Sequence, residues 1–132
     1  MELKKVEILP TESTPGIFMD PEGFIKIKGK GMVLDNTSNH EKIIEWITKY
    51  LANPAEVTFV SICMEYLNSY WTAKLITILK KISDIIFQHK KLIINWFYEE
   101  DDEDILERGE HISESLNLPI NFIVTGDIKS CC

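Results

Sequence analysis

The chain has 132 residues, enough for one domain that buries a hydrophobic core without metals or disulfides. Its formal net charge of -7 at pH 7 argues against nucleic acid or an anionic membrane as the main partner, because both attract basic patches. No apolar run reaches transmembrane length, and the first ten residues do not resemble a signal peptide. We therefore expect a single cytoplasmic domain over residues 1–132, with a protein or a cationic ligand as its partner.

The start of the chain predicts strands. Residues 3–9 alternate weakly between polar and apolar and are compatible with a first strand. Residues 17–19 and 24–29 predict a hairpin around residues 20–23, which contain the turn-forming Asp, Pro and Gly. In the second of these strands isoleucine alternates with lysine, which predicts a sheet with one solvated face at this end.

The middle of the chain changes its hydrophobic period. After a glycine-rich and polar loop over residues 29–39, a helix is expected over residues 41–51. Residues 57–66 are apolar and β-branched, as is typical of a buried strand. The period then becomes helical, and we expect a long helix to follow the strand directly and to end near residue 89.

The last part of the chain repeats the alternation of strand and helix. Residues 91–98 predict an interior strand covered on both faces, followed by a helix over residues 102–116. Gly109 falls on the apolar face of that helix, where it would permit close packing on the sheet. Residues 118–124 predict a last strand, in which Pro119 suits the start or an edge position, and residues 125–132 a flexible tail. The order of elements predicts an α/β fold, with helices packed on a mixed sheet and a β-hairpin at the N-terminus.

The strand-to-helix switch at Leu67-Asn68-Ser69 is a candidate functional site. It places small polar side chains beside the unpaired amides of a helix's first turn. In one interpretation Ser69 is the N-cap, a role worth about 1 kcal/mol for which Asn68 is an equal candidate. In the other, Ser69 is a phosphoacceptor, because a phosphate there would meet the helix dipole. The two interpretations are compatible.

Aromatic residues follow this switch. Tyr70 and Trp71 lie where the first turn of a helix should be partly exposed, and such a pair is suited to contacting another protein. Trp71 can equally fold back on the sheet edge. Trp46 and Trp96 fall in apolar periodic stretches, and we expect both in the core. The sequence contains no dinucleotide-binding, P-loop or nucleophile-elbow motif, which disfavours nucleotide binding and acyl transfer. We expect a binding protein with no cofactor rather than an enzyme.

An acidic run precedes the last predicted helix and consists of Glu99, Glu100, Asp101, Asp102, Glu103 and Asp104. Three interpretations stay open. Acidic side chains at a helix N-terminus are favoured by the dipole, by about 0.3 to 1 kcal/mol each. The run is also suited to docking a basic partner. As a divalent-metal site it would supply carboxylates, although the spaced ligands of an EF-hand loop are absent.

Several motifs of the chain resemble one family. They are Thr14-Pro15, the segment from Asp20 through Gly23 to Gly29, Trp46 with Tyr50-Leu51, Glu65-Tyr66-Leu67-Asn68-Ser69, and NWFYEEDDEDILERGE from Asn95 to Glu110. Together they resemble the SiaC-like family of bacterial regulatory phosphoproteins, from about Thr11 to Ile123. The resemblance implies a STAS-like fold, similar to anti-sigma factor antagonists, and a partner-switching role.

The resemblance also implies partners and a modification site. In such a system a serine/threonine kinase phosphorylates the protein, a metal-dependent phosphatase reverses this, and the unphosphorylated form binds and activates a diguanylate cyclase. The family's phosphoacceptor follows an asparagine, and the matching residue here is Ser69. The next two residues are small and carry hydroxyls in the family but are Tyr70 and Trp71 here, so Thr72 becomes a second candidate acceptor. An adaptor that binds constitutively, without phosphorylation, is the remaining alternative.

Overall fold

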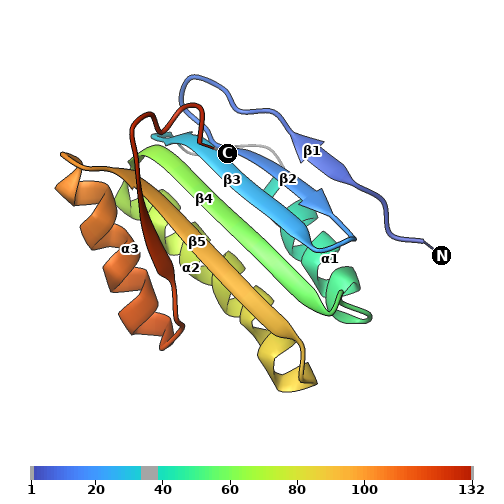
Figure 1. The fold of residues 1–132 in the computed structure, drawn as a ribbon. Helices are drawn as coiled ribbons and strands as arrows, with labels where there is room; N and C mark the ends of the chain where they lie inside the picture. The colour runs from blue at the N-terminus through green and yellow to red at the C-terminus, as the bar shows by residue number, and fades with distance from the viewer. Residues whose placement is uncertain (1, 34–38, 132) are drawn as a thin grey trace.

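The computed structural model describes residues 2–33 and 39–131 of the chain. One six-stranded sheet and the helices on it make up the fold (Figure 1). In chain order the elements are β1 (Val6–Ile8), β2 (Gly16–Asp20), β3 (Phe24–Gly31), α1 (Asn39–Leu51), β4 (Val57–Leu67), α2 (Ser69–Ile82), the 3-10 helix η1 (Ser83–Gln88), β5 (Lys91–Glu99), α3 (Glu103–Leu116) and β6 (Asn121–Thr125).

The sheet is mixed and its spatial order follows the chain. Strands β1, β2 and β3 pair antiparallel, and the predicted hairpin is the β2–β3 pair. Strands β3, β4, β5 and β6 pair in parallel, so each connection between them crosses over through a helix. The predicted α/β class, the mixed sheet and the N-terminal hairpin are therefore confirmed.

The helices cover one face of the sheet, and the core lies between them and the strands (Figure 1). Ile25 and Ile27 of β3 point into this core, while Lys26 on the opposite face is exposed, as the alternation predicted. The prediction that the strand of residues 91–98 is covered on both faces is wrong. In β5 only Ile94 and Trp96 are buried, because the helices pack on one face and leave the other half-exposed.

Other boundaries differ from the sequence prediction. The helix expected to reach residue 89 ends at Ile82 and continues as η1, where the Ser83 hydroxyl donates to the Lys80 carbonyl at 2.6 Å. This competition for a helix carbonyl is typical of a serine at a helix end. His89 then stops η1 in the left-handed conformation. Strand β3 extends to Gly31, two residues into the predicted loop, and residues 34–38 of that loop lie outside the described residues.

The chain after β6 turns back over the sheet. Ile128 is buried, and its amide donates to the Glu99 carboxylate at 3.0 Å. Burial raises the pKa of the Cys131 thiol, against the opposite effect of nearby Lys28, so the thiol stays protonated at neutral pH. The flexibility predicted for residues 125–132 stays a prediction, and residue 132 lies outside the described residues. No helix in the described ranges combines the length and the apolar character needed to cross a bilayer.

Gly109 confirms the predicted close packing of α3. A Cβ at this position would lie 2.7 Å from Cε2 of Trp96 and 2.8 Å from Cε1 of Phe122. Trp96 is fully buried, and its indole N–H donates to the Ile105 carbonyl at 3.1 Å. The missing side chain thus lets α3 rest directly on β5.

We expect Gly109→Ala to destabilise the fold. Alanine favours helix by about 1 kcal/mol over glycine, but overpacking a core costs about 1 to 3 kcal/mol, so a net loss is expected. Urea unfolding measures the change in the free energy of unfolding. Gly126→Ala is the matched control, because a Cβ there has no neighbour within 4 Å. Equal stability of the two variants would contradict the packing role of Gly109.

Candidate functional site

Asn68 makes the turn from β4 into α2. Its backbone is extended, and its Oδ1 accepts from the Trp71 amide at 2.9 Å, which identifies it as the N-cap of α2. Its Nδ2 donates to the Met32 carbonyl at 2.8 Å, and its amide donates to the Gly31 carbonyl at 3.0 Å. The same residue therefore starts the helix and holds it to the segment that follows β3.

Ser69 is the first residue of α2 rather than its cap, and its side chain is exposed. Within the described part of the chain, the Ser69 hydroxyl has no hydrogen-bond partner. Of the two interpretations of this serine, the cap belongs to Asn68. The Ser69 side chain is open to solvent.

Thr72, the second candidate acceptor, lies in a different environment. Its side chain is 8% exposed, and its hydroxyl donates to the Asn68 carbonyl at 2.7 Å. The same oxygen accepts from Nη1 of Arg108 at 3.2 Å. Phosphorylation of Thr72 would first require both bonds to break and the side chain to leave the protein interior, so the geometry favours Ser69.

The aromatic pair is split between the core and the surface. Trp71 is 6% exposed, and its indole N–H donates to the Val33 carbonyl at 2.7 Å. Its ring covers Gly31, where an added Cβ would lie 2.7 Å from the Trp71 side chain. Of the two alternatives for Trp71, folding back on the sheet is correct, and the expectation of an exposed contact residue is wrong.

Tyr70 stays at the surface and is 36% exposed. The ammonium of Lys74 lies 5.0 Å from the centre of the Tyr70 ring. Met32 and Val33, whose carbonyls are bonded to Asn68 and Trp71, have exposed side chains of 46% and 48%. Exposed apolar side chains thus belong to the two segments that meet at the start of α2, and we call Met32, Val33 and Tyr70 the apolar patch. The sequence analysis missed its first two members, because only the hydrogen bonds across the fold bring them to α2.

The acidic run is divided among several roles. Asp102 is the N-cap of α3 and accepts from the Ile105 amide at 3.1 Å, Glu99 accepts from the tail, and Asp104 pairs with Arg108. The carboxylates of Glu100, Asp101 and Glu103 are exposed. Among the described residues, no group of three or more His, Cys, Asp or Glu side chains converges as a metal site would require. The interpretation of the run as acidic residues at a helix N-terminus is confirmed for Asp102, the N-cap, and for Glu103 and Asp104 in the first turn of α3.

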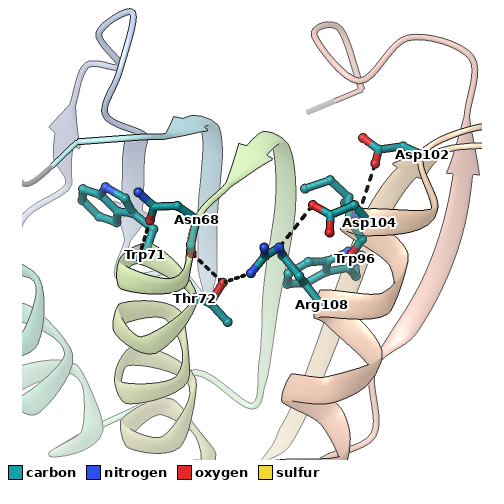
Figure 2. A network of polar contacts seen from close by, with 8 residues as sticks. Asn68, Trp71, Thr72, Trp96, Asp102, Asp104 and Arg108 are labelled. Carbon is teal, nitrogen blue, oxygen red and sulfur yellow. Dashed lines mark hydrogen bonds and ion pairs between the residues drawn. The ribbon is translucent and has the colours of Figure 1, made fainter.

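A chain of polar contacts joins the starts of α2 and α3 (Figure 2). It runs from Asn68 through Thr72 to Arg108 and ends at Asp104, whose carboxylate lies 3.2 Å from Nε of Arg108. The sequence analysis did not single out Arg108. Two signals in the sequence point to it, since it is the only arginine in the chain and lies one helical turn after Asp104.

His40 lies at the start of α1, and Lys74 of α2 is one of the charges that act on it. Burial and the positive charge of Lys74 lower the pKa of His40 below its ordinary value, against the opposite effect of Glu41. Its Nδ1 is buried with no hydrogen-bond partner within the described residues. His40 is therefore neutral at pH 7 and adds no charge near Lys74.

The geometry defines a small α/β domain in which an accessible serine begins a helix at the carboxyl edge of the sheet. The profile of SiaC family regulatory phosphoproteins matches residues 8–125. The chain belongs to the SiaC family, and the resemblance noted in the sequence is confirmed. Among curated proteins, none matches the chain significantly.

Solved structures of the family share this fold. Apo-SiaC from Pseudomonas aeruginosa is 20% identical, with a TM-score of 0.79 over 92% of this chain and 99% of its own. SiaC from the same organism, in complex with the diguanylate cyclase SiaD that it activates, is 21% identical, with a TM-score of 0.80 over 91% of this chain and 99% of its own. At these identities the two structures establish the fold of the chain.

We expect Asn68→Ala to lower the free energy of unfolding by roughly 1 to 2 kcal/mol, because it removes the cap and the bond to Met32. Ser69→Ala should change it by no more than about 0.5 kcal/mol, since the exposed hydroxyl makes no hydrogen bond with the described residues. Chemical unfolding of the two variants compares neighbouring positions on the same helix. A larger loss from Ser69→Ala than from Asn68→Ala would contradict the assignment of the cap.

The lowered pKa of His40 makes stability depend on pH. The unfolded chain binds a proton near pH 6.5, the ordinary value for histidine, while the folded protein binds it only at lower pH. The contribution of His40 to stability is therefore full above that value and is lost as pH falls through the lowered pKa. We expect the free energy of unfolding to fall less steeply with acidification in His40→Gln than in the wild type. Parallel curves for the two proteins would contradict this.

Proposed function

We propose that this protein is a phosphorylation-controlled binding module whose unphosphorylated form binds and regulates a signalling target. The observation that carries the proposal is the exposed hydroxyl of Ser69 at the start of α2, which has no bond to the described residues, next to a threonine whose hydroxyl is buried and engaged. Membership of a family of regulatory phosphoproteins supports it. The protein acts by binding and has no catalytic role of its own.

The partner surface consists of Ser69 and its neighbours on the same end of the molecule. This surface includes Asn68 and the apolar patch, of which Tyr70 is a member. The acidic residues 99–104 belong to it as well, because they precede the helix that packs beside α2. The protein partners are a serine/threonine kinase, a metal-dependent phosphatase and the target. A diguanylate cyclase is the target class that the structural relative SiaC suggests, and the switch would operate in the cytoplasm.

The switch works by changing the cost of burying Ser69 in an interface. The kinase moves a phosphoryl group from a nucleoside triphosphate to Oγ of Ser69, and the hydroxyl proton is released. The phosphate adds close to two negative charges beside the exposed ring of Tyr70. A partner that covers this patch then has to desolvate the phosphate. A loss of about 2 to 3 kcal/mol would weaken binding about 30- to 150-fold.

We expect phosphoserine at position 69, installed genetically, to weaken binding to the diguanylate cyclase of the native host about 30- to 150-fold. Isothermal titration calorimetry measures the affinity, and Ser69→Ala should bind like the wild type. Thr77→Asp is the charge control, because this exposed threonine lies two turns further along α2. Unchanged affinity for the phosphoserine protein would reject the switch and favour the constitutive adaptor.

A second experiment asks whether the modification occurs in the native host. Intact mass and phosphosite mapping, with the phosphatase inhibited during lysis, should find a phosphate on Ser69 and none on Thr72. The reason is the difference in accessibility between the two hydroxyls. Absence of phosphate under every growth condition would also favour the constitutive adaptor.

A further inference from the structure

Arg108 is placed to respond to a charge on α2. It is the only arginine among the 14 lysine and arginine residues of the chain. From α3, its Nη1 reaches Thr72 on α2 and its Nε reaches Asp104 on its own helix (Figure 2). The side chain is 30% exposed, so it lies between the two helices without being sealed from solvent.

We propose that Arg108 binds the phosphate of phosphorylated Ser69 and gives up its bonds to Thr72 and Asp104 to do so. This inference rests on the proposed function, since it assigns the residue that detects the modification. In the unphosphorylated protein Arg108 joins α2 to α3. In the phosphorylated protein it joins the phosphate to α3 and leaves the Asp104 carboxylate unneutralised.

The spacing on α2 brings the phosphate within reach. Ser69 and Thr72 are three positions apart on one helix, so their Cβ atoms lie about 5 to 6 Å from each other on the helix surface. The guanidinium of Arg108 is already bonded to the Thr72 hydroxyl at 3.2 Å. A phosphate on Ser69 lengthens that side chain, and the inference requires a change of side-chain rotamer to bring it to the guanidinium.

The exchange is favoured by charge and by shape. A phosphoserine carries close to two charges against one on Asp104, and its oxygens match the planar fork of a guanidinium. Asp104 is 61% exposed, so it regains solvent when the pair opens. Thr72 keeps its bond to the Asn68 carbonyl and loses only the one it accepts. Each group that Arg108 leaves therefore has a partner or water.

Lys74 is another cation on the first turns of α2, and its ammonium is held elsewhere. Its ammonium lies over the rings of Tyr70 and Trp71, at 5.0 and 5.7 Å from their centres. Lys74 is five positions from Ser69, on the opposite shoulder of the helix from Thr72. This makes it a matched control, with the same charge at the same end of α2 but without the geometry of Arg108.

The test uses full-length protein with phosphoserine encoded at position 69, so that it depends on neither the kinase nor the target. Titration by ³¹P NMR gives the second pKa of the phosphate, which is near 6 in a free phosphoserine. We expect this pKa to be lower in the wild type than in Arg108→Gln by at least about 0.5, because a bound guanidinium favours the dianion. The carboxylates of Glu103, Asp104 and Glu107 oppose this effect equally in both proteins. Lys74→Gln should leave the value close to that of the wild type.

A second readout covers the case in which Arg108→Gln does not fold. The chain has one arginine, so a single Nε–H signal appears in the side-chain region of a ¹H–¹⁵N spectrum and needs no assignment. Phosphoserine at position 69 should shift this signal and slow its exchange with water.

The phosphate pKa and the Nε–H signal decide the inference together. The same phosphate pKa with and without Arg108, or an Nε–H signal that phosphorylation leaves unchanged, would overturn it. If both readouts show that Arg108 binds the phosphate, but phosphorylation leaves the affinity for the cyclase unchanged, only the proposed function is rejected.

Discussion

The start of α2 depends on the side chain of Asn68, which satisfies a helix amide and the Met32 carbonyl at once. These two bonds fix the rotation of the helix where it leaves β4. Residues 69 and 71 are about 200° apart around a helix axis, so turning one inward turns the other outward. Trp71 enters the space above Gly31, and Ser69 faces solvent. The accessibility of Ser69 is therefore a consequence of the burial of Trp71.

The position of Arg108 depends on a second contact, between α3 and β5. Trp96 donates to the Ile105 carbonyl, and its ring occupies the space that a side chain at Gly109 would take. This fixes the face that α3 turns to the sheet. Residue 108 lies about 100° around the helix from Gly109, and from there its guanidinium reaches Thr72. Two tryptophans, each paired with a glycine, thus set the geometry between α2 and α3.

Hydrophobic period was sufficient to predict most of the fold, because a strand or a helix depends mainly on its own residues. It failed where a contact between residues far apart in the sequence determines the direction or the partner of a side chain. The direction of Trp71 depends on the space above Gly31, and the pairing of Arg108 with Thr72 joins residues 36 positions apart. Neither contact leaves a local pattern. The sequence analysis reached this region only through Ser69, by its place between strand and helix and by the family resemblance, and the arrangement of the residues around it required the structure.

The surroundings of Ser69 bear on the direction of a phosphate switch. If a basic partner contacted only the acidic residues before α3, a phosphate would strengthen the attraction rather than weaken it. The apolar patch of Met32, Val33 and Tyr70 changes this balance, because apolar surface is bound by excluding water. A phosphate at its border keeps water there and cannot be buried without a paired cation. Binding that is lost on phosphorylation therefore requires the partner to cover this patch, with the acidic residues contributing at its rim.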